Sequence, residues 1–82
     1  MKPLRLTFYT KDNCSLCEKA FHLLQELRQE YGFELDVVDI TQSEKAWEAF
    51  RHMVPVVSIG GEVKTFGRIE EYQLRAIIEN RV

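Results

Sequence analysis

The stretch Asp12-Asn13-Cys14-Ser15-Leu16-Cys17 stands where the pattern of the chain changes, and it holds both cysteines of the protein. Before it, apolar and polar side chains alternate as in a strand; after it, apolar side chains recur with the spacing of a helix. A Cys-x-x-Cys at such a strand–turn–helix junction predicts a redox-active dithiol. This junction therefore decides both the fold and the chemistry that we expect.

The two cysteines are expected to have different roles. At a helix start, Cys14 would lie beside unsatisfied backbone N–H groups and the positive end of the helix dipole, which favour its thiolate. The thiolate is the nucleophile in disulfide exchange. Cys17 follows one turn later on the same side of the helix, within reach of a mixed disulfide formed on Cys14. The sequence thus predicts that Cys14 attacks and Cys17 resolves.

The rest of the chain supplies short strands and helices around this junction. Alternation predicts a strand over 4–10, and helical spacing predicts a long helix from Ser15 to Tyr31 that ends at Gly32 in a left-handed C-cap. A second strand is expected over 33–40, where Val37, Val38 and Ile40 indicate burial on both faces, as in a parallel pair. The order strand, helix, strand predicts a right-handed βαβ unit.

The second half continues with a short helix and a hairpin. Thr41 to Glu44 match a capping box, which predicts a helix through about His52. Gly60-Gly61 separates two short predicted strands, 56–59 and 62–66, and predicts a two-residue hairpin turn that pairs them antiparallel. A last helix is expected over 69–80. The loops are short, so we expect one domain, residues 1–82.

The composition excludes several classes of function. The chain has 82 residues, of which 45% are hydrophobic and 29% charged, as in a soluble globular domain with one modest core. A net charge of −2 with both signs mixed predicts neither a nucleic-acid surface nor a polybasic membrane segment. The amino end has no secretory pattern, and no apolar run nears the ~20 residues that span a bilayer. We expect a cytoplasmic monomer without nucleic-acid or membrane partners.

Several motifs carry a resemblance to a known family. The order β-α-β-α-β-β-α, with the dithiol after the first strand and Val54-Pro55 before the third, resembles the thioredoxin superfamily. The form Cys-x-Leu-Cys-Glu, Tyr9-Thr10-Lys11 before it and Gly67-Arg68 after the fourth strand are most similar to small bacterial-type glutaredoxin-like proteins. The resemblance implies an α/β minimal thioredoxin fold, a four-stranded mixed sheet flanked by three helices. It also implies a thiol-disulfide oxidoreductase that serves cell redox homeostasis or protein disulfide reduction.

The resemblance implies a docking surface around the thiols. In such families the proline before the third strand is cis and faces the sulfurs; here it is Pro55. Val54 would then offer both its backbone N–H and its C=O to a substrate chain. The other candidate substrate-binding residues flank the motif or follow the fourth strand: Lys11, Asn13, Ser15, Leu16 and Arg68. Lys11 either lowers the pKa of Cys14 by its charge and matches the glutaredoxin lysine that helps bind glutathione, or it is a solvated turn residue. Arg68 either binds a substrate carboxylate or is a surface arginine.

The expected partners follow from the same resemblance. The substrate is a disulfide in a protein or a small molecule, and electrons come from glutathione or from a thioredoxin reductase. No organic cofactor or metal is required, with glutathione as a candidate co-substrate. Glutaredoxins commonly carry Pro-Tyr between the cysteines and a Gly-Gly pair before an acidic helix start, whereas here Ser15-Leu16 and Gly67-Arg68-Ile69-Glu70 occupy these places. We therefore expect weak glutathione binding.

Two alternatives remain open at the level of sequence. One is a redox-inert thioredoxin-fold binding module. The other is a carrier of a metal or iron–sulfur cluster that two chains share through the same cysteines. A zinc site within one chain is disfavoured, because zinc takes four ligands and only His22 and His52 could join the thiols. His22 lies five positions after Cys17, well round the predicted helix.

Overall fold

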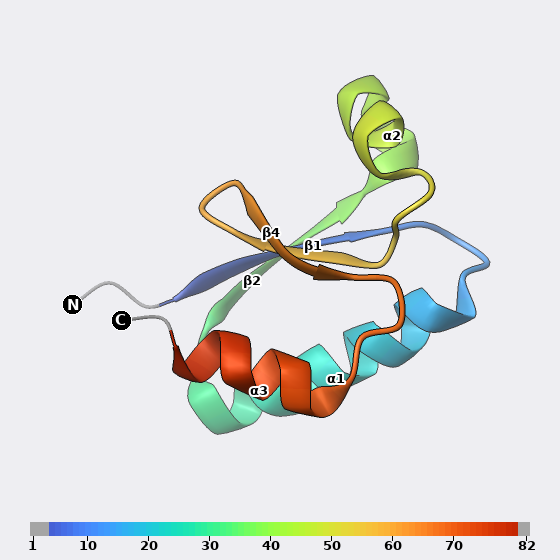
Figure 1. The fold of residues 1–82 in the computed structure, drawn as a ribbon. Helices are drawn as coiled ribbons and strands as arrows, with labels where there is room; N and C mark the ends of the chain where they lie inside the picture. Colours follow the sequence, from blue (N-terminus) through green and yellow to red (C-terminus); the bar gives the residue numbers. More distant parts are fainter. Residues whose placement is uncertain (1–3, 81–82) are drawn as a thin grey trace.

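The computed structural model describes residues 4–80, which form four strands and three α-helices in the expected order (Figure 1). The first half contains the long helix and a short 3-10 turn, η1, and the second half contains the hairpin and the last helix. The elements are β1 (Arg5–Thr10), α1 (Ser15–Tyr31), β2 (Glu34–Asp39), η1 (Ile40–Gln42), α2 (Glu44–Phe50), β3 (Val56–Ile59), β4 (Glu62–Phe66) and α3 (Glu71–Glu79).

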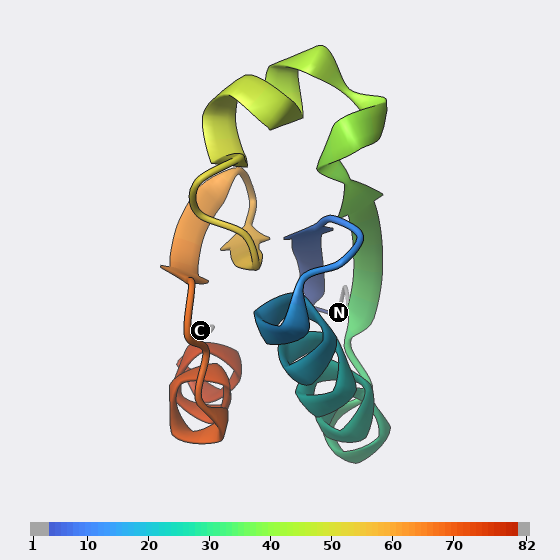
Figure 2. The same ribbon diagram turned by 90° about the vertical axis from the view of Figure 1, so that its right-hand side faces the viewer.

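The strands form one mixed sheet in the order β2-β1-β3-β4. β1 pairs with β2 in parallel and with β3 antiparallel, and β3 pairs antiparallel with β4. α1 and α3 cover one face of the sheet, and α2 lies on the opposite side, near the carboxyl ends of β1 and β2 (Figures 1 and 2). The predicted α/β fold with a four-stranded mixed sheet and three helices is confirmed.

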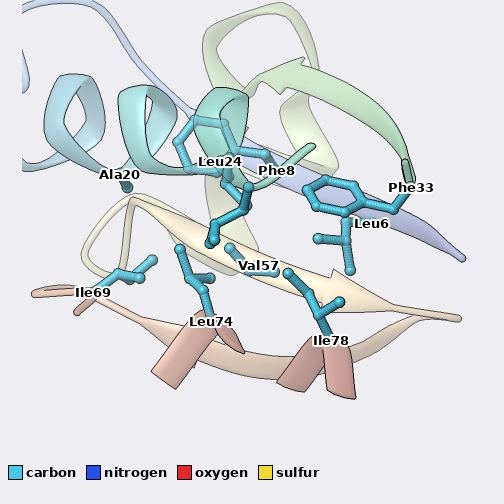
Figure 3. Packing of buried hydrophobic residues seen from close by; sticks show 10 residues of the cluster. Leu6, Phe8, Ala20, Leu24, Phe33, Val57, Ile69, Leu74 and Ile78 are labelled. Atoms are coloured by element: carbon cyan, nitrogen blue, oxygen red, sulfur yellow. The ribbon is translucent and has the colours of Figure 1, made fainter. Parts of the chain in front are cut away.

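The main core lies between the sheet and the helix pair α1 and α3. Leu6 and Phe8 of β1 and Val57 of β3 are fully buried and meet Leu24 of α1 and Leu74 of α3 (Figure 3). Burying an aliphatic or aromatic side chain of this size contributes about 1.5–3 kcal/mol to folding. This cluster fixes α1 against β1, and so fixes the helix start that follows β1.

α1 begins and ends where the sequence predicts. Cys14 is its N-cap residue, with extended backbone angles, and Gly32 follows the helix with φ 75°, where its N–H donates to the Arg28 carbonyl at 2.8 Å. A left-handed residue at this position is commonly glycine, since other side chains are strained there. Arg75 of α3 ties the two helices together through a bidentate ion pair with Glu30.

The expected burial of the second strand on both faces is wrong. β2 is an edge strand, and its pattern includes exposed positions on both faces, with Val37 50% exposed. Ile40, which the sequence places at the end of this strand, is fully buried but lies in η1. The parallel pairing itself is confirmed, because residues 5–10 pair in order with residues 34–39.

The start of α2 also differs from the prediction. The N-cap is Ser43, whose hydroxyl accepts the Ala46 N–H at 3.2 Å, so the expected capping box from Thr41 to Glu44 is wrong. Thr41 instead donates from its backbone and its hydroxyl to Asp39, which caps η1. The centre of the Phe50 ring lies 4.4 Å from that of Tyr9, and this contact seats α2 on the sheet.

The carboxyl-terminal third follows the predicted hairpin closely. Gly60 and Gly61 have φ values of 57° and 84°, the left-handed conformation that a primed two-residue turn requires. α3 starts at Glu71, two residues after the predicted start at Ile69, which is buried in the core as part of the preceding loop. No helix within residues 4–80 is both long enough and apolar enough to cross a membrane.

Candidate functional site

The turn between β1 and α1 presents Cys14 at the first position before the helix. Asn13 has φ 56°, a left-handed conformation that asparagine tolerates better than most residues, and it turns the chain into α1. The Sγ atom of Cys14 then accepts the backbone N–H of Cys17 at 3.2 Å. Cys14 is partly exposed and carries a free thiol. The predicted placement of Cys14 at the helix start is confirmed.

Cys17 lies one turn further along α1 and is 2% exposed. Burial raises the pKa of the Cys17 thiol, and its hydrogen bond with the Cys14 side chain acts in the same direction. The Thr10 side chain and the Lys11 backbone act in the opposite direction and lower the same pKa in part. Cys17 is therefore a buried thiol, and the neighbouring groups that lower its pKa favour formation of its thiolate.

Thr10 is the site residue that sequence reasoning missed. It is the last residue of β1 and pairs with Asp39 of β2, and its side chain lowers the pKa of the Cys17 thiol. A signal was present in the alternation of β1, because Thr10 continues the inward series of Leu6 and Phe8. Threonine is common in strands, however, so the alternation alone does not distinguish a functional Thr10 from an ordinary strand residue.

The Val54–Pro55 bond is cis, as the resemblance implied. The antiparallel register pairs Tyr9 with Val56, which places Pro55 opposite Thr10 at the edge of the sheet where the dithiol lies. Pro55 is buried, and its carbonyl accepts the Gly67 N–H at 2.9 Å. The same N–H also points at the Met53 carbonyl at 3.2 Å. The loop before α3, residues 67–70, is thus hydrogen-bonded to the proline loop, residues 51–55.

Val54 does not offer both of its backbone groups to a substrate. Its N–H donates to the Phe50 carbonyl at 3.1 Å, so the expectation of a free N–H is wrong. The reason is local: the chain leaves α2 through helical turns, and residues just after a helix bond back to its last carbonyls. Within residues 4–80 the Val54 carbonyl has no hydrogen-bonded partner, and it remains the group that can pair with an incoming chain.

Two hollows lie beside the start of α1, and the other candidate substrate-binding residues line one or the other of them, except Ser15. The β2-side pocket, of about 600 Å³, is lined by Lys11, Asn13 and Cys17 together with residues of β1, β2 and α1. The α3-side groove, of about 580 Å³, is lined by Leu16 and Arg68 together with residues of α1 and the loop before α3. Ser15 is exposed and lines neither hollow.

The two cysteines have no third metal-ligating neighbour in the part of the chain that the structure describes. Among residues 4–80, no three side chains of His, Cys, Asp or Glu are grouped so that they could hold a metal ion. His22 is exposed on α1 and faces Glu26 at 3.9 Å. The arrangement within one chain is therefore a pair of thiols, one partly exposed and one buried, one helical turn apart.

Similar proteins agree with this architecture. An uncharacterized protein of Mycobacterium tuberculosis and one of Mycobacterium bovis are each 28% identical over 74 residues, which cover 84% of this chain and 76% of the relative. A protein from X. campestris solved by X-ray crystallography superposes with a TM-score of 0.78 at 25% identity, covering 94% of this chain and 99% of that chain.

Two further structures share the fold at lower identity. Thioredoxin from Fasciola hepatica superposes with a TM-score of 0.71 at 20% identity, covering 98% of this chain and 82% of that chain. A Nitrosomonas europaea protein solved by NMR gives a TM-score of 0.76 at 24% identity, covering 94% and 93% of the two chains. Residues 5–79 match the family described as Glutaredoxin-like domain (DUF836). With its thioredoxin-like fold and its dithiol at the start of α1, the chain belongs to this glutaredoxin-like family.

Proposed function

We propose that this protein is a thiol-disulfide oxidoreductase that uses Cys14 and Cys17. The observation that supports this most directly is the asymmetry of the two thiols. Cys14 is partly exposed at the helix start, whereas Cys17 is 2% exposed one turn behind it, with the Cys17 N–H donating to the Cys14 sulfur. An accessible nucleophile with a shielded partner beside it suits a two-step exchange.

In the proposed cycle, the Cys14 thiolate attacks one sulfur of the substrate disulfide, and the other substrate sulfur leaves as a thiolate. Cys17 then loses its proton and attacks the Cys14 sulfur, which releases the second substrate thiolate and leaves a Cys14–Cys17 disulfide. The substrate gains two electrons and the protein loses two. The Cys17 N–H faces the Cys14 sulfur, so it stabilises negative charge there when this sulfur acts as nucleophile.

An external thiol or reductase must return two electrons, and we propose that glutathione does so poorly. The glutathione carboxylates need donors at the start of α3, but the Glu70 N–H there already donates to the Gln73 side chain at 2.8 Å. Val54 retains one backbone group for pairing instead of two. Each missing hydrogen bond to a charged group costs about 1.5–3 kcal/mol, or roughly one to two decades of affinity. A thioredoxin reductase is the donor that we favour.

The test is a coupled assay on protein purified without oxygen. Disulfide substrate is offered with glutathione and its reductase, or with thioredoxin reductase, and NADPH loss is followed in each case. We expect turnover with thioredoxin reductase, little with glutathione, and none for Cys14→Ser. Fast turnover with glutathione, with a stable glutathione adduct on Cys14 of Cys17→Ser, would refute the proposed donor. A free-thiol count beside iron and zinc analysis tests the dithiol itself, because bound metal with no exchange in either assay contradicts the proposed activity.

A further inference from the structure

The β2-side pocket has an apolar lining that is open to solvent. Phe21 of α1 and Val37 of β2 line it and are 36% and 50% exposed, respectively, which is high for large apolar side chains. Phe8 lies behind them, with its ring centre 6.1 Å from that of Phe21. The buried thiol of Cys17 belongs to the same lining. The pocket therefore offers apolar contact area directly beside the dithiol.

The polar part of the lining has an excess of negative charge. Asp12, Glu18 and Asp39 contribute three carboxylates against the single ammonium of Lys11. Two hydrogen bonds from Thr41 lower the pKa of Asp39, which keeps this carboxylate charged at neutral pH. None of the three acids forms an ion pair with another residue in the range 4–80. The carboxylates are thus available to a positively charged ligand.

The hollow on the other side of α1 has a different character. In the α3-side groove, Lys19 and Arg68 supply two permanent positive charges beside Leu16 and Ile69, against Glu18 and Glu70. Ligands that approach the dithiol from its two sides would therefore meet different charges. A net negative pocket and a more balanced groove, separated by the first turns of α1, can orient a chain that lies across Cys14.

We propose that the β2-side pocket binds a cationic side chain with an apolar stem, arginine or lysine, from the protein that carries the substrate disulfide. The stem would pack on Phe21 and Val37, and the charged head would meet Glu18 and Asp39. The exposed ring of Phe21 can also attract the cation through its face. This inference rests on the proposed function, and it adds the chemistry by which that function selects a substrate.

Mixed disulfides of short cysteine peptides test the selection. Each peptide carries thionitrobenzoate on its cysteine and has arginine, norleucine or glutamate as the neighbouring residue. In Cys17→Ser, the Cys14 thiolate forms a disulfide with the peptide sulfur, and the bond to thionitrobenzoate breaks. The coloured thionitrobenzoate thiolate leaves, because it is the better leaving group. We expect the arginine peptide to react fastest, by about threefold for each carboxylate it engages.

Charge-neutralising variants locate the effect in the pocket. Asp39→Asn should remove part of the arginine advantage, and asparagine keeps the oxygen that caps η1. Glu18→Gln should also reduce the advantage, but Glu18 lines both hollows, so Asp39→Asn is the variant that assigns the effect to the β2-side pocket. Glu26→Gln, on the exposed face of α1 outside the pocket, is the matched control and should keep the full advantage. Equal rates for the arginine and norleucine peptides, or an advantage that survives both pocket variants, would overturn the proposal.

A second measurement does not depend on redox activity. The Cys14→Ser variant is titrated with the arginine peptide whose cysteine has been alkylated, and backbone amide chemical shifts are recorded. We expect changes at Phe21, Val37 and Asp39, with weaker changes for the norleucine peptide. Changes confined to residues 68–70, or none, would overturn the pocket assignment even if the exchange chemistry is present. Absent exchange in the coupled assay with these shifts intact would instead reject only the proposed function.

Discussion

Replacing Thr10 with valine should slow the step in which Cys17 resolves a mixed disulfide. Valine has nearly the shape of threonine but lacks the hydroxyl through which Thr10 lowers the pKa of Cys17. Burial already raises the pKa of Cys17, so the thiol predominates at neutral pH and the reactive thiolate is the minor form. Without the Thr10 hydroxyl, one of the two hydrogen-bonding contributions that lower this pKa is lost, and the contribution of the Lys11 backbone remains.

The size of the effect follows from the energy of that hydrogen bond. A hydrogen bond to a charged group contributes about 1.5–3 kcal/mol, and sulfur is a weak acceptor, so the lower end applies. A loss of about 1.4 kcal/mol reduces the thiolate fraction tenfold. The remaining thiolate is more nucleophilic, with a Brønsted coefficient of about 0.4–0.5, so the resolving step should slow about three- to fourfold at neutral pH. The difference should shrink as pH rises, because at high pH the thiolate forms in both proteins.

Reaction with dithionitrobenzoate separates the two steps of exchange. Attack by Cys14 releases the first thionitrobenzoate at a rate that depends on reagent concentration, and attack by Cys17 releases the second at a rate that does not. Thr10→Val should change the second phase alone, and Thr10→Ser, which keeps a hydroxyl, should behave as the wild type. The reasoning is refuted if Thr10→Val leaves the pH profile of the second phase unmoved, or if Thr10→Ser shifts it equally.

Three further predictions test the site and the frame around it. Brief alkylation with iodoacetamide should label Cys14 well before Cys17, because Cys17 is 2% exposed; mass spectrometry that found Cys17 labelled first would contradict the assigned roles. Leu24→Ala should lower the free energy of unfolding by about 2–5 kcal/mol in urea titration, because Leu24 is fully buried, whereas Tyr72→Ser at an exposed site should cost little. Arg75→Met should destabilise the fold more at neutral than at acidic pH, because Arg75 lowers the pKa of Glu30 in the folded protein. The stability that this ion pair contributes is present above the pKa of Glu30 in the unfolded chain, and it is lost as pH falls through the lower pKa of Glu30 in the folded protein. An equal loss of stability at both pH values would count against that ion pair.

The sequence was sufficient where a boundary depends on one local signal. Cys14 at the helix start, Gly32 after the helix and Gly60-Gly61 in the hairpin are each set by the conformation of a few neighbouring residues. Such signals act within one turn of chain, so the bounds of α1 and of the hairpin could be predicted from the residues alone. The same holds for the i to i+3 relation of the two thiols.

Most of the misses depend on contacts between distant segments. Val37 is apolar and lies in a parallel strand, but nothing in its neighbours reveals that β2 is at the edge of the sheet. Ser43 rather than Thr41 caps α2, because the chain first forms η1, in which Ile40 is buried. Thr10 meets Cys17 only after β1 and α1 are packed together. The Val54 N–H is the local exception, because the chain leaves α2 through helical turns and this N–H bonds back to the Phe50 carbonyl four residues earlier.

The amide of Gly67, which lies between the carbonyls of Met53 and Pro55, has a practical consequence for following this molecule in solution. It is a single N–H that joins the loop before α3 to the loop that carries Pro55, so any event that parts the two loops must break its hydrogen bonds. Its hydrogen–deuterium exchange rate and its proton chemical shift therefore report the separation of the loops at one resonance. A partner that docks across the proline loop without moving α3 would slow this exchange, and one that lifts α3 would accelerate it.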